Sequence, residues 1–341
     1  MMNTENTAEA MPLNTTQPHA NGVEFEKGKC VSVIFNPVSG KGNPEARKSR
    51  ISEALARHGY RCRYLVTTPD EGAQHFARQA LNDGVDLIAV SGGDGTVIEV
   101  MSALVGRGVP LAVFPAGTGN LLSVNLKLPT EIAAAADVAL FGERRKLDLA
   151  RLVIHDGKAD GRDPQYFAIL AGAGYDAWVI KDADREAKNR LGMFAYFFSA
   201  LKNLRRRPTK VDIRLDGADK TFRRRAKSVM IANMGHLQCS LVVIPDAEPD
   251  DGLLEVAILK AESLWEWVHL LFNTILGRLK TDRAVEYHKV RKVEVRLSTA
   301  QPIQFDGETT KEKHHSFSVE VVPMAVEVMV PKVAASSLLS S

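Results

Sequence analysis

Three glycine-rich segments in the first half of the chain have the residue types that bind phosphate groups. They are Asn36-Pro37-Val38-Ser39-Gly40, Gly92-Gly93-Asp94-Gly95-Thr96 and the PAGTGN segment at residues 115 to 120. Glycine lets a backbone approach an anion closely, and backbone N–H groups at a helix start favour negative charge. Asp94 adds a carboxylate that can orient a phosphate through Mg2+. Together the segments predict a nucleotide site, although the one around Asp94, taken alone, is more typical of a tight turn that caps a helix.

A regular alternation of strands and helices surrounds these segments. Apolar runs predict strands at residues 30 to 36, 63 to 68, 85 to 91 and 109 to 117, and helices at residues 44 to 58, 70 to 82 and 96 to 106. Such an alternation indicates a parallel sheet with helices on both faces. The carboxyl ends of parallel strands meet at one edge, where ligands bind. We therefore expect the three glycine-rich segments to lie side by side.

The pattern changes after residue 146 to that of a mostly antiparallel β-sandwich or barrel. Strands are predicted at residues 146 to 154, 165 to 172, 210 to 215, 222 to 233, 252 to 259, 292 to 297, 302 to 307 and 316 to 322. Two helical insertions interrupt them, at residues 182 to 204 and 262 to 279. The fold class is therefore α/β, with a parallel-sheet domain followed by a β-sandwich domain.

The expected domain organisation has four parts. A disordered tail over residues 1 to 28 precedes the α/β domain at 29 to 146, and the β-rich domain at 147 to 330 precedes a second tail at 331 to 341. The last strand of the β-rich domain can extend back into the α/β domain. A short alanine run at residues 133 to 136 reads as low complexity.

Composition excludes several classes of protein. The 341 residues carry 44 basic and 41 acidic side chains, a balance that does not call for a nucleic-acid partner. Three distant cysteines, Cys30, Cys62 and Cys239, fit reduced thiols in a cytosolic protein. The sequence has neither a signal peptide nor an apolar run of the roughly 18 residues that a membrane span needs. We expect a cytoplasmic protein.

Six segments, in this order and at this spacing, resemble those of the lipid kinases that include diacylglycerol and sphingosine kinases, relatives of NAD kinases and phosphofructokinases. They read NPVSG, GGDGTVIEV, PAGTGN, KLDLARL, PDAEPDDGLLEVAIL and QFDGE. The resemblance implies a nucleotide domain of the phosphofructokinase and NAD kinase type, a β-sandwich domain for the lipid, and the cofactors ATP and Mg2+. It also implies transfer of the γ-phosphate of ATP to a lipid hydroxyl.

The resemblance assigns roles to individual residues. Glu308 would be the catalytic base, with Asp306 beside it and Asp94 ordering the phosphates through Mg2+, while Asp148 belongs to an interdomain polar network. Positions implied to hold ATP are Asn36, Pro37, Val38, Ser39, Gly40, Thr68, Gly92, Gly93, Asp94, Gly95, Thr96, Glu99 and Thr118. A second, structural metal site is implied at Glu248, Asp251 and Leu253. A carboxylate such as Glu308 suits the chemistry, because it can accept the proton of an attacking hydroxyl.

Three departures from the family pattern leave the acceptor lipid open. Ile98 stands where diacylglycerol-type members carry Asn, and Leu121 and Val124 stand where they carry an Asp and an Arg. Two other functions stay open: a catalytically silent lipid-binding protein of the same fold, which these departures suggest, and an NAD kinase-like enzyme, which would share the GGDGT loop.

Two apolar segments with basic ends are expected to bring the protein to a membrane surface. Residues 191 to 207 combine an aromatic face with Arg205, Arg206 and Arg207. Residues 264 to 279 place apolar side chains on one helical face, namely Leu264, Val268, Leu271, Ile275 and Leu279. Such helices can lie at a bilayer with their cations against anionic head groups, although a helix of this kind more often packs in a protein core. Besides this lipid surface, a homodimer is compatible with the sequence.

Overall fold

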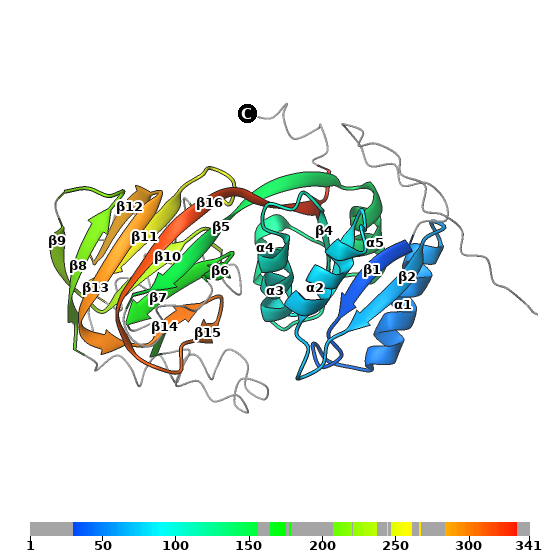
Figure 1. Cartoon of the computed structure of the whole chain (residues 1–341), viewed down its shortest axis with the longest axis horizontal. Coiled ribbons are helices and arrows are strands. Elements are labelled where there is room, and N and C mark those ends of the chain that lie inside the picture. The colour runs from blue at the N-terminus through cyan, green and yellow to red at the C-terminus, as the bar shows by residue number, and fades with distance from the viewer. Residues whose placement is uncertain are drawn as a thin grey trace, which may run out of the picture.

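The computed structural model describes residues 30–155, 164–174, 177–178, 207–219, 221–236, 244, 247–260, 266 and 284–332. An α/β lobe and a β-rich lobe lie side by side, and two long strands run from one into the other (Figure 1). The first predicted tail, the second predicted tail from residue 333 on, and both predicted helical insertions except Glu266 lie outside these residues. In the described ranges, no helix is long and apolar enough to cross a membrane.

The α/β lobe contains the predicted parallel sheet, with strand order β2-β1-β3-β4. Its strands are β1 (Cys30–Phe35), β2 (Arg61–Val66), β3 (Ile88–Gly92) and β4 (Leu111–Pro115). The helices are α1 (Pro44–Ala56), α2 (Ala73–Asn82), α3 (Asp94–Leu104), α4 (Leu121–Leu126) and α5 (Ile132–Phe141). Helices α1 and α5 pack on one face of the sheet, and α2 and α3 on the other. Both faces are covered, so β1, β3 and β4 are buried along almost their whole length, whereas the edge strand β2 keeps exposed positions at Arg61 and Arg63.

The alanine run at residues 133 to 136 is not low-complexity sequence but the start of α5, a helix that the sequence analysis missed. Its buried side consists of Ala135, Ala136, Ala139 and Leu140. Because most of these buried side chains are small, α5 can pack closely against the sheet and α1. The Glu131 side chain accepts a hydrogen bond of 2.7 Å from the Ala134 N–H and caps the helix.

The β-rich lobe is a sandwich of two sheets, which confirms the predicted fold class. One sheet has the order β12-β11-β10-β7-β14-β15, and the other continues the parallel sheet through β16, β13, β8 and β9, with β5 and β6 alongside. Large apolar side chains of both sheets, among them Phe167, Phe317, Ile231 and Val256, fill the space between them. The strands are β5 (Glu143–Ile154), β6 (Gln165–Phe167), β7 (Leu170–Gly174), β8 (Thr209–Leu215), β9 (Phe222–Ala226), β10 (Ser228–Ala232), β11 (Leu254–Leu259), β12 (Val285–Val290), β13 (Lys292–Gln301), β14 (Ile303–Phe305), β15 (Glu308–Thr309) and β16 (His314–Val330).

Two stretches predicted as single strands are each two strands in different sheets. Residues 165 to 172 divide into β6 and β7, and residues 222 to 233 divide into β9 and β10 at Lys227. A sandwich permits this because a strand can bend at a corner and pass from one sheet to the other. Apolar residues continue through the first bend, and in β9 Phe222 and Ala226 join the sandwich core beside Arg224, so the sequence pattern alone shows no break.

Strand β16 ties the two lobes together. It pairs antiparallel with β5 and β13 and, at Val328, parallel with Leu111 of β4. Its register against β5 shifts between Val322 and Val326, where Met324 adopts a left-handed φ of 50°. Because one strand belongs to both lobes, their relative orientation is fixed by sheet hydrogen bonds.

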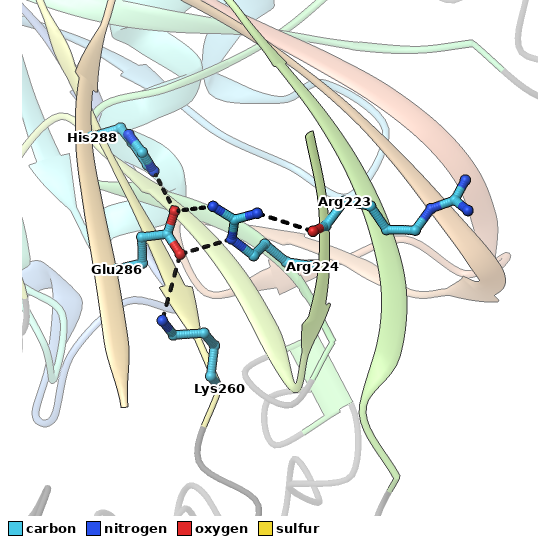
Figure 2. A network of polar contacts seen from close by, with 5 residues as sticks. All are labelled: Arg223, Arg224, Lys260, Glu286 and His288. Carbon is cyan, nitrogen blue, oxygen red and sulfur yellow. Dashed lines mark hydrogen bonds and ion pairs between the residues drawn. The ribbon is translucent and has the colours of Figure 1, made fainter. Parts of the chain in front are cut away.

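A charged network joins the open edges of the two sandwich sheets (Figure 2). Arg224 of β9 donates to both oxygens of Glu286 on β12, at 2.9 and 3.0 Å. His288 lies 3.0 Å from the same carboxylate and Lys260 3.5 Å from it. These donors, Arg224 foremost, lower the pKa of Glu286 to about 2. The network links β9 and β12, which are not in the same sheet.

We expect Glu286→Gln to reduce the free energy of unfolding at pH 7 by about 1 to 2 kcal/mol, the scale of a hydrogen-bonded charge pair at a partly exposed site. The lowered pKa means that this stabilisation is present above the unfolded-state value of 4.5 and disappears as the pH falls toward about 2. Urea unfolding of the variant and the parent should therefore converge at low pH. The control is Glu294→Gln in the more exposed Arg214 pair, which should cost less at pH 7. Equal losses in the two variants would contradict a special role for the edge network.

Candidate functional site

The three glycine-rich loops meet at the carboxyl edge of the parallel sheet, as predicted. They follow β1, β3 and β4, which are adjacent and parallel. A Cβ on Gly117 would lie 2.7 Å from the Cα of Gly93, and one on Gly40 would lie 2.3 Å from the Ala116 carbonyl oxygen. Ser39 Oγ accepts a hydrogen bond of 3.2 Å from the Gly93 N–H. The loops therefore touch through their backbones, and only glycine fits at these contacts.

The first loop is held by a side chain that the sequence analysis did not select. Arg47 of α1 donates to the carbonyl oxygens of Ser39 and of Asn36, the latter at 2.5 Å, and its guanidinium lies 4.4 Å from the centre of the Phe35 ring. Asn36 in turn donates to Thr96 Oγ1 at 2.8 Å. Arg47 therefore holds both ends of the first loop through its backbone carbonyl groups. Its only sequence signal is its place on the helix that follows the loop.

Asp94, the first residue of α3, connects the second and third loops. Its Oδ1 accepts a hydrogen bond of 2.6 Å from the Leu121 N–H at the start of α4. Burial raises the pKa of Asp94, and backbone N–H groups at residues 120 to 122 oppose that rise. A hard carboxylate in this place suits Mg2+ carried on a nucleotide, because that ion needs only one or two protein oxygens besides phosphate and water. In the described part of the chain, no three His, Cys, Asp or Glu side chains form a metal cluster.

Glu308 comes from the β-rich lobe and lies against this edge of the α/β lobe. A Cβ on Gly95 would be 3.5 Å from Glu308 Oε1. Strands β14 and β15 form a hairpin whose loop is Asp306-Gly307, with left-handed φ values of 45° and 86°. An Asp-Gly pair is typical of such a tight turn. The hairpin thus presents the exposed carboxylate of Glu308 to the start of α3, although Glu308 and Gly95 are 213 positions apart in the sequence.

Asp306 holds the hairpin in place. Its carboxylate accepts hydrogen bonds from the backbone N–H groups of Ala168, Ile169 and Leu170, at 2.7, 3.0 and 3.0 Å. Burial raises the pKa of Asp306 to about 6, the three donors oppose that rise, and the negative charge of Asp94 adds to it. The segment that Asp306 binds is the bend between β6 and β7. These contacts fix the turn that precedes Glu308 on the β6–β7 bend.

Asp148 lies where β5 leaves the α/β lobe, and it is buried. Its two carboxylate oxygens accept hydrogen bonds of 2.7 Å each from the Gly252 and Met324 N–H groups. Its own carbonyl oxygen accepts from Asn233 Nδ2 at 3.0 Å. Asp148 therefore fixes three segments of backbone at the junction of the lobes, in agreement with a place in an interdomain network.

Three further residues that the resemblance assigns to ATP binding are Glu99, Thr68 and Thr118, and the first two have structural hydrogen bonds. Glu99 Oε2 accepts from the Ala73 N–H at 2.7 Å and so caps α2. Thr68 Oγ1 accepts from the Glu71 N–H at 3.1 Å, and Thr118 is exposed in the third loop. Contacts of these three residues with ATP remain predictions.

The three residues that depart from the family pattern differ in burial. Ile98 and Leu121 pack against the core of the α/β lobe. Val124 is 42% exposed on α4. Apolar packing accounts for the first two, and no described contact accounts for the third.

The second metal site predicted at Glu248, Asp251 and Leu253 has a competing cation. Asp251 Oδ2 lies 3.4 Å from the Lys289 ammonium, and Oδ1 accepts from the Leu253 N–H at 2.9 Å. Lys289 also lies 3.2 Å from Glu255. A metal ion would have to share or displace the lysine, so these residues as arranged do not fit the ion well.

A groove of about 700 Å³ lies on the outer face of the sandwich, away from the loops. Its charged residues are largely paired with one another, since Arg223 binds Asp212 and Arg214 binds Glu294. It shares no residue with the edge where Glu308 meets Gly95. We therefore take that edge, and not the groove, as the candidate site.

Comparisons with known proteins agree with this arrangement. Residues 30–152 match the family model of the diacylglycerol kinase catalytic domain, and residues 169–330 match the YegS C-terminal NAD kinase beta sandwich-like domain. A diacylglycerol kinase of Bacillus subtilis is 30% identical over 82% of this chain and 90% of its own length. One of Mycobacterium tuberculosis is 29% identical over 77% of this chain and 85% of its own length.

A solved structure shows the same fold. The crystal structure of a diacylglycerol kinase from Bacillus anthracis superimposes with a TM-score of 0.69, covers 90% of this chain and 98% of its own, and is 23% identical. Both lobes and their junction are included at that coverage. With the Bacillus subtilis relative matched over nearly its whole length, the chain belongs to the diacylglycerol kinase family.

Proposed function

We propose that the protein is an ATP-dependent lipid kinase, which transfers the γ-phosphate of ATP to a hydroxyl of a membrane lipid of the diacylglycerol or sphingoid type. The observation that carries the proposal is the position of Glu308 against Gly95, at the edge where three glycine-rich loops meet. The names of the matched relatives support the lipid acceptor. A silent lipid-binding protein would not need Asp94 and Glu308 on facing lobes.

The proposed reaction is an in-line displacement. The acceptor oxygen forms a bond to the γ-phosphorus as the bond from that phosphorus to the β–γ bridging oxygen breaks, and ADP leaves. Glu308 accepts the proton of the hydroxyl. Backbone N–H groups of the loops and the start of α3 hold the phosphates, and Mg2+ bound through Asp94 would neutralise their charge. The protein thus supplies position and electrostatics for a reaction that needs little covalent help.

The acceptor of such a kinase lies in a membrane, so we also propose peripheral association with a lipid surface. The segments that suggest it, residues 191 to 207 and 264 to 279, lie outside the described residues except for Arg207 and Glu266. The proposal therefore depends on the sequence pattern of those segments and on the nature of the substrate.

A product survey tests the proposed function. The protein is incubated with γ-labelled ATP, Mg2+ and either a total lipid extract in detergent micelles or NAD. We expect label in a phosphorylated lipid in the organic phase, absent without protein, and the mass of that product identifies the acceptor. Label in NADP would assign the NAD kinase-like alternative, and no transfer to either acceptor would favour the silent lipid-binding protein.

A further inference from the structure

The side-chain amide of Asn125, on α4, both donates to and accepts from the backbone of His236 in the β-rich lobe. Its Nδ2 donates to the Leu121 carbonyl at 2.8 Å and to the His236 carbonyl at 2.9 Å. Its Oδ1 accepts from the His236 N–H at 3.2 Å. The amide therefore pairs with His236 as a neighbouring strand would, through one donor and one acceptor.

On the side of the α/β lobe, Asn125 is linked through α4 to Asp94 at the edge of the sheet where the glycine-rich loops meet. Helix α4 directly follows the third glycine-rich loop, and the N–H of its first residue, Leu121, donates to Asp94. The Nδ2 group of Asn125 donates to the carbonyl of the same residue, Leu121. Asp94 and Asn125 are thus held by one short helix.

On the side of the β-rich lobe, His236 is linked through Asn233 to the β14–β15 hairpin that carries Glu308. Three residues before His236, the buried Asn233 donates from Nδ2 to the Ala168 carbonyl at 3.0 Å, and its backbone N–H donates to the Ile169 carbonyl at 2.9 Å. The N–H groups of Ala168 and Ile169 donate to Asp306. Asp306 begins the turn that carries Glu308.

We propose that Asn125 is an interdomain positioning residue that fixes the distance between Asp94 of the α/β lobe and Glu308 of the β-rich lobe. The chain of contacts runs from Asp94 through α4 and Asn125 to His236, and from Asn233 through the β6–β7 bend to Asp306. Asn125 itself touches no reacting group. The inference rests on the proposed function, because it assigns Asn125 an effect on the step in which Glu308 takes part.

Asn125→Ala should lower kcat on the lipid about 10-fold, because a small misplacement of a reacting group can cost up to about 100-fold in rate. The dissociation constant for ATP should change less than about 3-fold, since the three loops stay intact. Asn125→Asp should do no better than Asn125→Ala, because a carboxylate cannot donate to the carbonyls of Leu121 and His236. Glu131→Ala is the matched control: it also removes a side-chain hydrogen bond in the α/β lobe, but on the opposite side of the sheet, and it should retain full turnover.

A double-mutant cycle separates positioning from a general loss of structure. If Asn125 acts through Glu308, adding Asn125→Ala to Glu308→Gln should cost less than about 2-fold beyond the single Glu308→Gln loss. Full turnover by Asn125→Ala, or losses that multiply in the double variant, would overturn the proposal. Should Asn125→Ala not fold, as judged by thermal unfolding, Asn125→Ser replaces it in the cycle. Full turnover by Glu308→Gln alone would instead refute Glu308 as the base, which is a separate result.

Discussion

Replacing Glu308 by glutamine is expected to lower kcat on the lipid about 100-fold, equivalent to about 2.7 kcal/mol of transition-state stabilisation. Glutamine keeps the shape of the side chain but cannot accept the proton of the hydroxyl. ATP affinity should stay within about 3-fold, because the loops that hold the phosphates belong to the other lobe. The exposed position of Glu308, beside Gly95, is that of a group meant to face a substrate and not to stabilise the hairpin.

Calorimetric titration with ATP and steady-state turnover on the best lipid measure the two effects separately. Glu312→Gln is the control, because Glu312 is also exposed and lies in the loop that follows the same hairpin. It should behave as the parent protein does. If Glu308→Gln lost ATP binding or kept full turnover, Glu308 would have a structural role, and the base would have to be sought at Asp306 or Asp94.

Replacing Asp94 by asparagine should lower turnover by about 100-fold or more, the scale for loss of a key electrostatic group at a transition state. Asparagine can still accept the Leu121 N–H through its amide oxygen, so the start of α4 should stay in place. What is lost is the negative charge that would hold Mg2+ on the phosphates. Unlike Glu308→Gln, this variant should weaken binding of ATP in the presence of Mg2+.

The measurement is turnover as a function of Mg2+ concentration, together with thermal unfolding. The Asp94→Asn protein should unfold near the temperature of its parent and need more Mg2+ for half-maximal rate. Asp137→Asn, on the exposed side of α5, is the control and should change neither quantity. An unaltered Mg2+ dependence with near-normal turnover would remove Asp94 from the proposed mechanism.

The sequence predicted the features that depend on local pattern. The alternation of strands and helices predicted the parallel sheet, and because parallel strands end at one edge, it also placed the loops of Asn36, Gly93 and Thr118 together. The strand predicted at residues 302 to 307 ends earlier in the structure, because Asp306 and Gly307 form the hairpin turn that precedes Glu308. The family resemblance placed Glu308 opposite the glycine loops, and the structure brings it to Gly95.

Features that depend on long-range pairing were not predictable. Nothing local shows that residues 165 to 172 bend between two sheets, because the inner faces of both halves are equally apolar. Helix α5 was missed because its buried stripe is alanine, which gives little hydrophobic contrast. Arg47 and Asn125 were missed because their partners are backbone carbonyls and N–H groups, which leave no complementary residue type in the sequence.

The most direct test of the account is a single-turnover transfer experiment. Enzyme in excess over γ-labelled ATP is mixed with Mg2+ and the lipid identified in the product survey, and label in the lipid is followed over time for the parent protein and Glu308→Gln. We expect the parent to move the label from ATP to the lipid in one phase, and Glu308→Gln to bind ATP equally well but to transfer the labelled phosphoryl group about 100-fold more slowly. Equal transfer rates in the two proteins, or release of the label as free phosphate without labelled lipid, would contradict a lipid kinase that uses Glu308 as its base.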